Sequence, residues 1–144
     1  PQNIGAARIR GTECSIGSNL GGRLRVGGTY SYLDSKDVGP IPFYNGRELP
    51  SRPRHTLGFS LDVLLARWKL SYEFNHIGEN YLDPANHYLV PARDIHNAAV
   101  QWRPLGNGVM IAVEGRNLTD NQISDVNGFP LPGRTFFMTF GYQP

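Results

Sequence analysis

The sequence predicts an all-β fold, more specifically an antiparallel up-and-down transmembrane β-barrel segment that contributes about seven strands to a larger barrel. Its 144 residues include 17 Gly and 11 Pro, and only 18% are charged, which favours many short strands joined by turns over a helical bundle. The candidate strands are roughly 9 to 11 residues long, as a tilted strand needs to cross a bilayer's hydrocarbon. Their connections alternate between short and long, which is typical of barrels in outer membranes.

Seven segments bounded by turn residues have the composition of strands. They cover residues 4–14, 23–33, 54–64, 68–77, 95–103, 109–118 and 134–142. The connections 15–22, 65–67 and 104–108 are short, and the connections 34–53, 78–94 and 119–133 are long. We therefore expect tight periplasmic turns at one end of the sheet and larger external loops at the other.

The first of these segments alternates imperfectly. We expect Arg8 and Arg10 to point into the barrel, which puts Glu13 on the side that faces lipid. An extra residue in the strand near Gly11 would reset the phase and bring Glu13 inward. We therefore expect a β-bulge near Gly11.

The later segments separate into an apolar phase and a polar phase, as a wall between lipid and a wet lumen requires. The separation is complete from 23 to 77, and Phe137 interrupts the polar phase of the last strand. The predicted apolar phases are Leu24, Val26, Gly28, Tyr30 and Tyr32; Leu57, Phe59, Leu61 and Val63; Trp68, Leu70, Tyr72 and Phe74; Ala98, Val100 and Trp102; Val109, Ile111, Val113 and Gly115; and Phe136, Met138, Phe140 and Tyr142.

Aromatic residues fall at both ends of the apolar phases. Tyr30 and Tyr32 lie at the predicted external end, whereas Trp68, Trp102 and Tyr142 lie beside the predicted periplasmic turns or the end of the last strand. Amphipathic rings prefer the boundary between hydrocarbon and water. We therefore expect these five residues to mark the two membrane interfaces.

The sequence offers no recognisable catalytic, metal, cofactor or nucleotide site, and we expect no enzymatic activity. His55, His76 and His96 fall at external strand ends, but nothing in their spacing requires them to converge on a metal. Cys14 is the only cysteine, so no internal disulfide is expected. Gly27 lies mid-strand with no helix after it, unlike a phosphate-binding loop. The arginines are scattered, which argues against a nucleic-acid partner.

Two sets of residues are candidates for contact with a ligand or with water. Charged residues of the polar phases would line a hydrated lumen: Glu73, Glu114, Arg23, Arg25 and Arg116. If a ligand is bound, the long external loops are expected to hold it, because loops on a rigid scaffold are free to vary. Their aromatic and imidazole rings suit stacking on a flat ligand: Phe43, Tyr44, Tyr81, His87, Tyr88 and Phe129.

Several strings, taken in order, carry a family resemblance. They are ARIRGTE at 7–13, YSYL at 30–33, PRHT at 53–56, GRNLTD at 115–120 and PGRTFF at 132–137. In sequence and spacing they resemble the C-terminal portion of the barrel of TonB-dependent outer-membrane receptors. The resemblance extends over essentially all of residues 1–144.

The resemblance implies a barrel of about 22 strands with a plugged lumen, located in the cell outer membrane. Such receptors take up an iron–siderophore complex, vitamin B12 or a similar scarce nutrient with energy relayed by TonB. The implied partners are outer-membrane lipid, the remainder of the barrel, the plug domain and, through the plug, the TonB complex. Residues 1–144 contain no counterpart of the plug, and the chain begins at Pro1, so we expect a fragment of a longer protein.

Two other functions fit the same pattern. A small structural or adhesive outer-membrane barrel would have a similar wall, and a soluble β-sandwich that acts as a binding module would show the same alternation. An upstream plug-like domain would favour transport. A mature chain that begins near Pro1 would favour the small barrel, and solubility without detergent would favour the sandwich.

Overall fold

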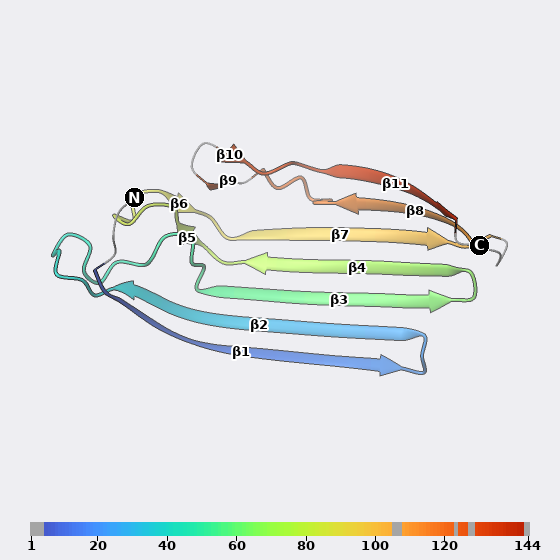
Figure 1. Ribbon diagram of the computed structural model, residues 1–144, viewed down its shortest axis with the longest axis horizontal. Coiled ribbons are helices and arrows are strands. Elements are labelled where there is room, and N and C mark those ends of the chain that lie inside the picture. Colours follow the sequence, from blue (N-terminus) through green and yellow to red (C-terminus); the bar gives the residue numbers. More distant parts are fainter. Residues whose placement is uncertain (1–4, 105–107, 123, 127–128, 143–144) are drawn as a thin grey trace.

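The computed structural model describes residues 5–104, 108–122, 124–126 and 129–142 of the chain, and they are organised as β-strands and connections (Figure 1). Within these residues no helix is long and apolar enough to span a membrane. The strands are β1 (Ala7–Leu20), β2 (Leu24–Asp37), β3 (His55–Leu65), β4 (Trp68–Ile77), β5 (Asn80–Tyr81), β6 (Leu89–Val90), β7 (Arg93–Trp102), β8 (Val109–Arg116), β9 (Ser124–Val126), β10 (Phe129–Pro130) and β11 (Thr135–Tyr142).

The main sheet has seven antiparallel strands in the order β1-β2-β3-β4-β7-β8-β11, so each strand pairs with its neighbours along the chain. The four short strands form two separate hairpins, β5–β6 and β9–β10, within long connections. Short turns lie at one end of the sheet and long loops at the other (Figure 1). This confirms the predicted up-and-down, antiparallel wall and its alternation of short and long connections.

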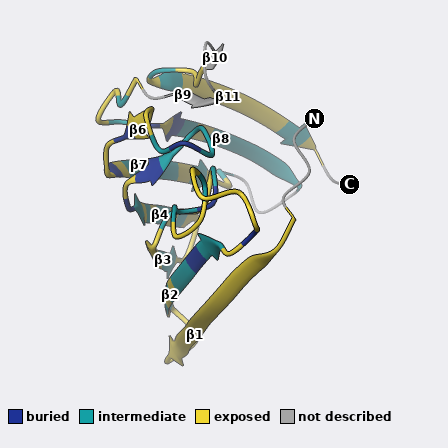
Figure 2. Cartoon of the chain, turned by 90° about the vertical axis from the view of Figure 1, so that its left-hand side faces the viewer, coloured by how far each residue is buried: buried dark blue, intermediate teal, exposed yellow. Residues whose placement is uncertain are grey.

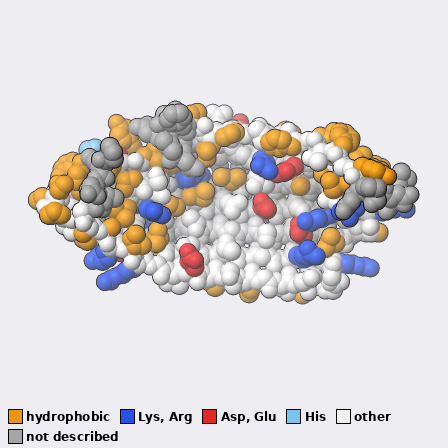
Figure 3. Space-filling model, in the orientation of Figure 1, with side chains coloured by type: hydrophobic (Ala, Val, Ile, Leu, Met, Phe, Trp, Pro, Cys, Tyr) orange, Lys and Arg blue, Asp and Glu red, His pale blue; other side chains and the backbone are white. Residues whose placement is uncertain are grey.

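The sheet is curved, and Figure 2, which looks from the loop end, shows it as an arc with one concave face. Paired residues in an antiparallel sheet point to the same face, so the register defines an outer, convex face and an inner, concave face. Ser60 pairs with Glu73 on the inner face, whereas Leu61 pairs with Tyr72 on the outer face. Figure 3 shows the inner face, where scattered charges lie among other polar side chains and backbone.

Most apolar side chains of the main sheet are not buried. Leu57, Leu70 and Val100 lie on the outer face of the central strands β3, β4 and β7, and their exposed fractions are 41%, 39% and 40%. The buried apolar side chains of the described residues are Leu49, Ala85 and Val90, and all three lie at the loop end. An apolar face this extensive requires an apolar environment outside the chain.

The seven predicted strands agree in number with those of the main sheet and, for β4, in both ends. The predicted apolar phases from 23 to 142 all lie on the outer face, because the register pairs them with one another from β2 to β11. The hairpins β5–β6 and β9–β10 were not predicted. Arg23, expected to line the lumen, lies in the turn before β2.

The expected β-bulge in the first strand and the expected inward direction of Arg8 and Arg10 were both wrong. β1 pairs with β2 without interruption from Ala7 opposite Asp37 to Leu20 opposite Leu24. This register puts Glu13 on the inner face with Ser31, and it puts Arg8 and Arg10 on the outer face with Lys36 and Asp34. The reason is strand length: both strands have 14 residues and extend at the loop end beyond β3, so the outward arginines lie beyond the apolar band.

The register of this hairpin is fixed by its turn. Gly21 and Gly22 have φ angles of 58° and 68°, and the Arg23 N–H donates to the Leu20 carbonyl at 3.2 Å. Positive φ at both central residues is the conformation of a type I′ turn, whose twist matches that of the flanking strands. The short connection therefore contains far fewer residues than the predicted range 15–22.

Candidate ligand-binding site at the loop end of the sheet

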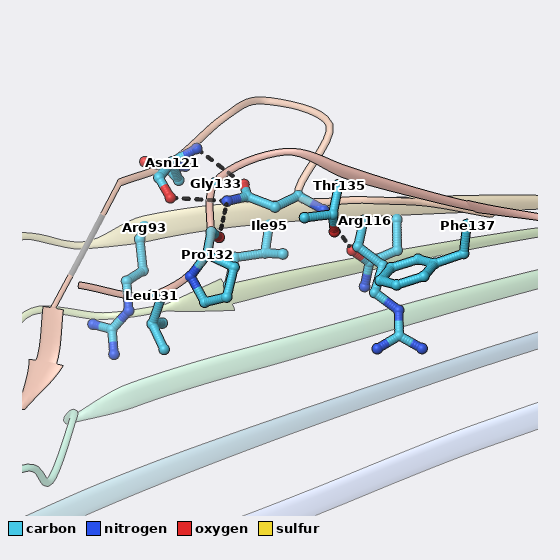
Figure 4. Close-up of a pocket in the computed structure, with 11 residues that line it drawn as sticks. Arg93, Ile95, Arg116, Asn121, Leu131, Pro132, Gly133, Thr135 and Phe137 are labelled. Carbon is cyan, nitrogen blue, oxygen red and sulfur yellow. Dashed lines mark hydrogen bonds between the residues drawn. The ribbon is translucent and has the colours of Figure 1, made fainter. Parts of the chain in front are cut away.

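Two features at the loop end are candidates for contact with a ligand. The first is a cavity on the inner face of β7, β8 and β11 (Figure 4). The second is a cluster of rings on two loops, 38–54 and 78–92. We call these two segments the paired loops. The cavity is described first because backbone and side-chain contacts both define it.

The cavity has a volume of about 340 Å³ and is closed on one side by residues 117–121 and 131–133. Strand β7 contributes the inner-face residues Arg93, Ile95 and Asn97 to its wall. Figure 4 shows Arg93 and Arg116 at its two ends, with apolar side chains between them. The remaining lining residues are Asn117, Asn121, Leu131, Pro132, Gly133, Thr135 and Phe137.

Asn117 shapes this cavity by tying the connection to itself and to β7. Its side chain donates to the backbone carbonyls of Asn121 at 2.8 Å and Pro132 at 3.3 Å, and its Oδ1 accepts the Asn121 N–H at 2.9 Å. Its own N–H donates to Asn97 Oδ1 at 3.0 Å. Asn117 is only 9% exposed and has a φ of 49°, a left-handed conformation that Asn tolerates better than most residues.

Asp120 and Gly133 complete the closure. Asp120 Oδ1 accepts the N–H of Arg134 at 2.8 Å, which joins the start of the connection to the start of β11. A Cβ on Gly133 would lie 2.6 Å from the same Oδ1, so any larger residue would displace this carboxylate from its position. The NLTD and PGR strings are therefore two halves of one structure that forms the edge of the cavity.

The cavity combines positive charge with apolar surface. The Arg93 guanidinium is buried and donates to Asn80 Oδ1 at 3.0 Å. Arg116 Nε donates to Glu114 Oε1 at 2.5 Å, and its guanidinium lies 5.3 Å from the centre of the Phe137 ring. Arginine held in place beside apolar side chains suits an anionic ligand with a partly apolar body.

The paired loops are joined by hydrogen bonds between segments far apart in the sequence. Arg47 Nη1 donates to the Ala85 carbonyl at 2.5 Å, and the Ser51 N–H donates to the Tyr81 carbonyl at 2.7 Å. Asn86 bonds to the backbone of Glu48 through both ends of its amide, each at 2.9 Å. These bonds make the two loops one unit.

A carboxylate organises the second of these loops. Asp83 accepts the backbone N–H groups of His87 and Tyr88, each at 2.8 Å, and that of Ala85 at 3.1 Å. Partial burial raises the pKa of Asp83, but the N–H donors of Tyr88, His87 and Ala85 outweigh it, and the pKa lies below its ordinary value. The charged form of Asp83 is therefore the one that this loop stabilises.

The structure brings together three of the predicted ligand residues. Phe43 packs edge-on against Tyr44, with centroids 5.1 Å apart, and lies 6.3 Å from His87. The Arg47 guanidinium lies 4.9 Å from the centre of the Phe43 ring. Phe43 remains 52% exposed, so one face of this ring cluster is open.

The other three predicted residues are more scattered. Tyr81 is half-buried in β5, and Tyr88 is 57% exposed beside β6. The backbone of Phe129 lies in β10, and its side chain is outside the described residues. Of the other five, whose side chains the structure describes, none lines the cavity. Sequence analysis missed the residues of the cavity except Arg116. The paired strings at 115–120 and 132–137 were the available signal for that cavity.

The predicted interface residues occupy the two ends of the outer face. Trp68 and Trp102 pair directly beside the short turns, and their rings stack with centroids 5.4 Å apart. At the loop end, the Tyr32 ring lies 5.3 Å from that of His55. Tyr30 lies beside them, and Tyr142 extends from the short-turn end of β11 with 72% exposure.

The three outer-face histidines each have a different partner. The Nδ1 atoms of His55 and His96 lie 2.9 and 2.8 Å from tyrosine hydroxyls, and that of His76 lies 2.7 Å from a carboxylate. The partners are Tyr30, Tyr72 and Asp94, respectively. Within the described part of the chain, no three His, Cys, Asp or Glu residues are grouped as a metal site would require.

Comparisons with known proteins agree with this architecture. A family model described as the TonB dependent receptor-like β-barrel matches residues 1–118. Among curated proteins there is no significant match.

Solved structures give the same architecture. The siderophore receptor PiuA from Acinetobacter baumannii superposes with a TM-score of 0.85 at 17% identity, and BauA, the ferric preacinetobactin receptor of that organism, with 0.82 at 20%. The ferric yersiniabactin uptake receptor FyuA from Yersinia pestis superposes with 0.79 at 17%. Each match covers 94% of this chain and 22% of the receptor, so the chain spans about a fifth of their length.

Proposed function

Since the chain belongs to the TonB-dependent receptor β-barrel family, we propose that it forms the C-terminal sector of an outer-membrane receptor for a scarce nutrient. The cargo would be an iron–siderophore complex, vitamin B12 or a similar nutrient, taken up with energy relayed by TonB. The observation that carries this proposal is the curved seven-stranded sheet with an apolar outer face and a polar inner face.

The proposal locates the outer face in the lipid of the cell outer membrane. The exposed apolar side chains of the outer face would then be covered by the acyl chains of the lipid. The rings of Trp68, Trp102 and Tyr142 would lie at the periplasmic interface, and those of Tyr30 and Tyr32 at the external interface. Nothing in the described residues covers the outer face with a second sheet, as a soluble β-sandwich would require.

The proposal also requires partners at both sheet edges. Strands β1 and β11 are the edges of the described sheet, and each would present an unpaired row of backbone groups to lipid. The remaining strands of a larger barrel would pair with them. The inner face would then surround the plug domain, and contact with TonB would occur through that plug.

The loop end would meet the ligand first. Arg93 and Arg116 at the cavity would attract an anionic chelate, and its apolar wall would contact the organic part of the ligand. On the paired loops, the rings of Phe43, Tyr44 and His87 would stack on a flat ligand. Tyr81, Tyr88 and Phe129 would add contacts from neighbouring segments. In this scheme the chain binds and conducts its cargo and performs no catalysis.

Nutrient uptake by cells tests the proposal. Cells that lack other receptors would express the complete polypeptide that carries this sequence and would be grown under iron limitation. They would be offered a panel of ferric catecholates, hydroxamates and carboxylates. Vitamin B12 would be offered in a parallel assay. We expect uptake of at least one cargo that disappears when TonB is deleted. Fractionation that finds the protein outside the outer membrane, or uptake that persists without TonB, would contradict the proposal.

A matched pair of variants separates the cavity from the wall. Arg116→Gln removes a cation from the cavity, whereas Arg103→Gln removes one from the opposite, short-turn end of the chain. We expect weaker binding of the accepted cargo by Arg116→Gln and unchanged binding by Arg103→Gln. Equal effects of both would assign the role to net charge and not to the cavity.

A further inference from the structure

The outward direction of Arg8 and Arg10 leaves three cations on the outer face beyond the apolar band. The register puts Arg10 next to Asp34 and Arg8 next to Lys36 at the loop end of β1 and β2. Figure 3 shows basic side chains gathered at the lower left, beside the loop ends of these strands. We call Arg8, Arg10 and Lys36 the outer basic cluster.

The height of this cluster relative to the membrane follows from strand geometry. Tyr32 pairs with both Thr12 and His55, so its ring lies in the row of aromatic residues at the external interface. Arg10 and Arg8 are two and four residues beyond Thr12 along the same face, which is roughly 7 and 14 Å along the strand. The cluster therefore lies just outside the proposed lipid interface, where headgroups are found.

Few carboxylates lie near the positive charges of the outer basic cluster. Among the described residues, neither the Arg8 side chain nor the Arg10 side chain makes a hydrogen bond or ion pair, and both are exposed. Lys36 lies 3.9 Å from Asp34, the carboxylate of the same hairpin. Glu48 pairs with Lys36 through an isolated bridge, but its own carboxylate is engaged by Arg54.

The pairing of Arg8 with Lys36 would be unfavourable without an anion. Like charges directly opposite each other in a sheet destabilise it, and Asp34, the carboxylate on this face of the hairpin, lies opposite Arg10 and not opposite Arg8. A phosphate would relieve this repulsion, because guanidinium groups bind phosphate oxygens through two parallel hydrogen bonds. The position beside the lipid-facing band favours a phosphate that belongs to a lipid.

We propose that the outer basic cluster binds the phosphate groups of a phosphorylated glycolipid in the outer leaflet of the membrane. The inference rests on the proposed outer-membrane location. The acyl chains of that lipid would lie along the apolar outer face of β1 and β2, below Tyr30 and Tyr32. Its phosphates would bridge Arg8, Arg10 and Lys36.

Binding of defined lipids tests this site. The complete polypeptide that carries this sequence would be purified in detergent and titrated with diphosphorylated lipid A and with the same lipid stripped of phosphate, with native mass spectrometry as the readout. Substituting Gln for both Arg8 and Arg10 should weaken binding of the phosphorylated lipid roughly 30-fold, at about 1 kcal/mol per cation. Binding of the stripped lipid should not change.

Two control variants make the result specific. Arg25→Gln removes a cation from the inner face of the same hairpin and should bind as the unsubstituted protein does. The double variant Arg8→Lys and Arg10→Lys keeps both positive charges and should retain most of the affinity for the phosphorylated lipid. Sheet circular dichroism would establish that the Gln variant is folded, and the affinity retained by the Lys variant distinguishes lost charge from lost structure.

Three results would overturn the proposal. The first is equal affinity of the Gln variant and the unsubstituted protein for diphosphorylated lipid A. The second is equal affinity of the unsubstituted protein for the two lipids. The third is complete displacement by inorganic phosphate, which would assign the cluster to free phosphate. TonB-dependent uptake, measured on the variants at positions 8 and 10, should be unchanged, so failure of the lipid site and failure of the transport function are separable.

Discussion

The strands of the main sheet and the loop end above them are held together by different interactions. In the strands, the backbone ladder is continuous and most side chains project into the surroundings. At the loop end, side chains bond to backbone groups: Arg47, Asn86 and Asn117 each join separate segments, and Asp83 organises its own loop. The wall therefore tolerates many side chains of the right polarity, whereas the loop end depends on particular ones.

The largest expected effect comes from charge on the outer face of the wall. Leu61 lies near the middle of β3 on that face, opposite Tyr72. Leu61→Arg should cost about 2–4 kcal/mol of folding free energy in phospholipid vesicles, because the bilayer midplane penalises the charge. The adjacent Ser60→Arg faces the inner side and should cost much less. Equal costs in urea unfolding would remove the distinction between the faces.

The next largest effect should come from Asn117 at the loop end. Asn117→Ala removes three side-chain hydrogen bonds and leaves alanine at a positive φ. We expect a local loss of about 1–3 kcal/mol, seen as faster hydrogen exchange of the Asn121 N–H. Asn19→Ala, beside the first turn, serves as the control. Unchanged protection of Asn121 in Asn117→Ala would show that backbone contacts alone hold the connection.

Asp83 should give a smaller effect that depends on pH. Its lowered pKa means that its carboxylate stabilises the loop fully above about pH 4, the ordinary value, and that this contribution is lost as the pH falls through the folded value. Asp83→Ala should cost about 1 kcal/mol at neutral pH, measured by exchange of the His87 and Tyr88 N–H groups. Asp83→Asn keeps one acceptor oxygen and should show a smaller loss without the acid transition.

The smallest effect should come from a pair of wall side chains that contact each other. Trp68 and Trp102 stack with an interplanar angle of 17° on the outer face. A double-mutant cycle with alanine at each position should give a coupling energy of about 0.5–1.5 kcal/mol. A larger value would mean that the wall, like the loop end, depends on specific side-chain partners.

The difference between the two regions explains how much was predictable from the sequence. Alternation of polarity depends only on the surroundings of each strand, so it located β4 at both ends and separated the faces from β2 onward. It was wrong for β1 because either phase put a charge on the outer face: Arg8 and Arg10 in one, Glu13 in the other. Pairing with β2 decided the phase, and local sequence did not contain that information.

The loop end was less predictable because its contacts are non-local. Phe43 and His87 come together through bonds that link residues 38 positions apart, such as Arg47 with Ala85. The cavity depends on Asn117 reaching the carbonyl of Pro132, 15 positions away. Loop position alone indicated Phe43, Tyr44 and His87 as candidates. Nothing distinguished Arg93, in the predicted connection 78–94, or Asn97, in the strand predicted at 95–103, as residues of a cavity.

The chain-order arrangement of the main sheet has a kinetic consequence. No strand must wait for a distant segment, since each pairs with the one before it and the one after it. Closing a hairpin between neighbours costs less loop entropy than joining remote segments, and such pairings form faster. The connections of three residues between β1 and β2 and of two residues between β3 and β4 make these hairpins easy to close, so they are well suited to act as nuclei to which the remaining strands add in succession.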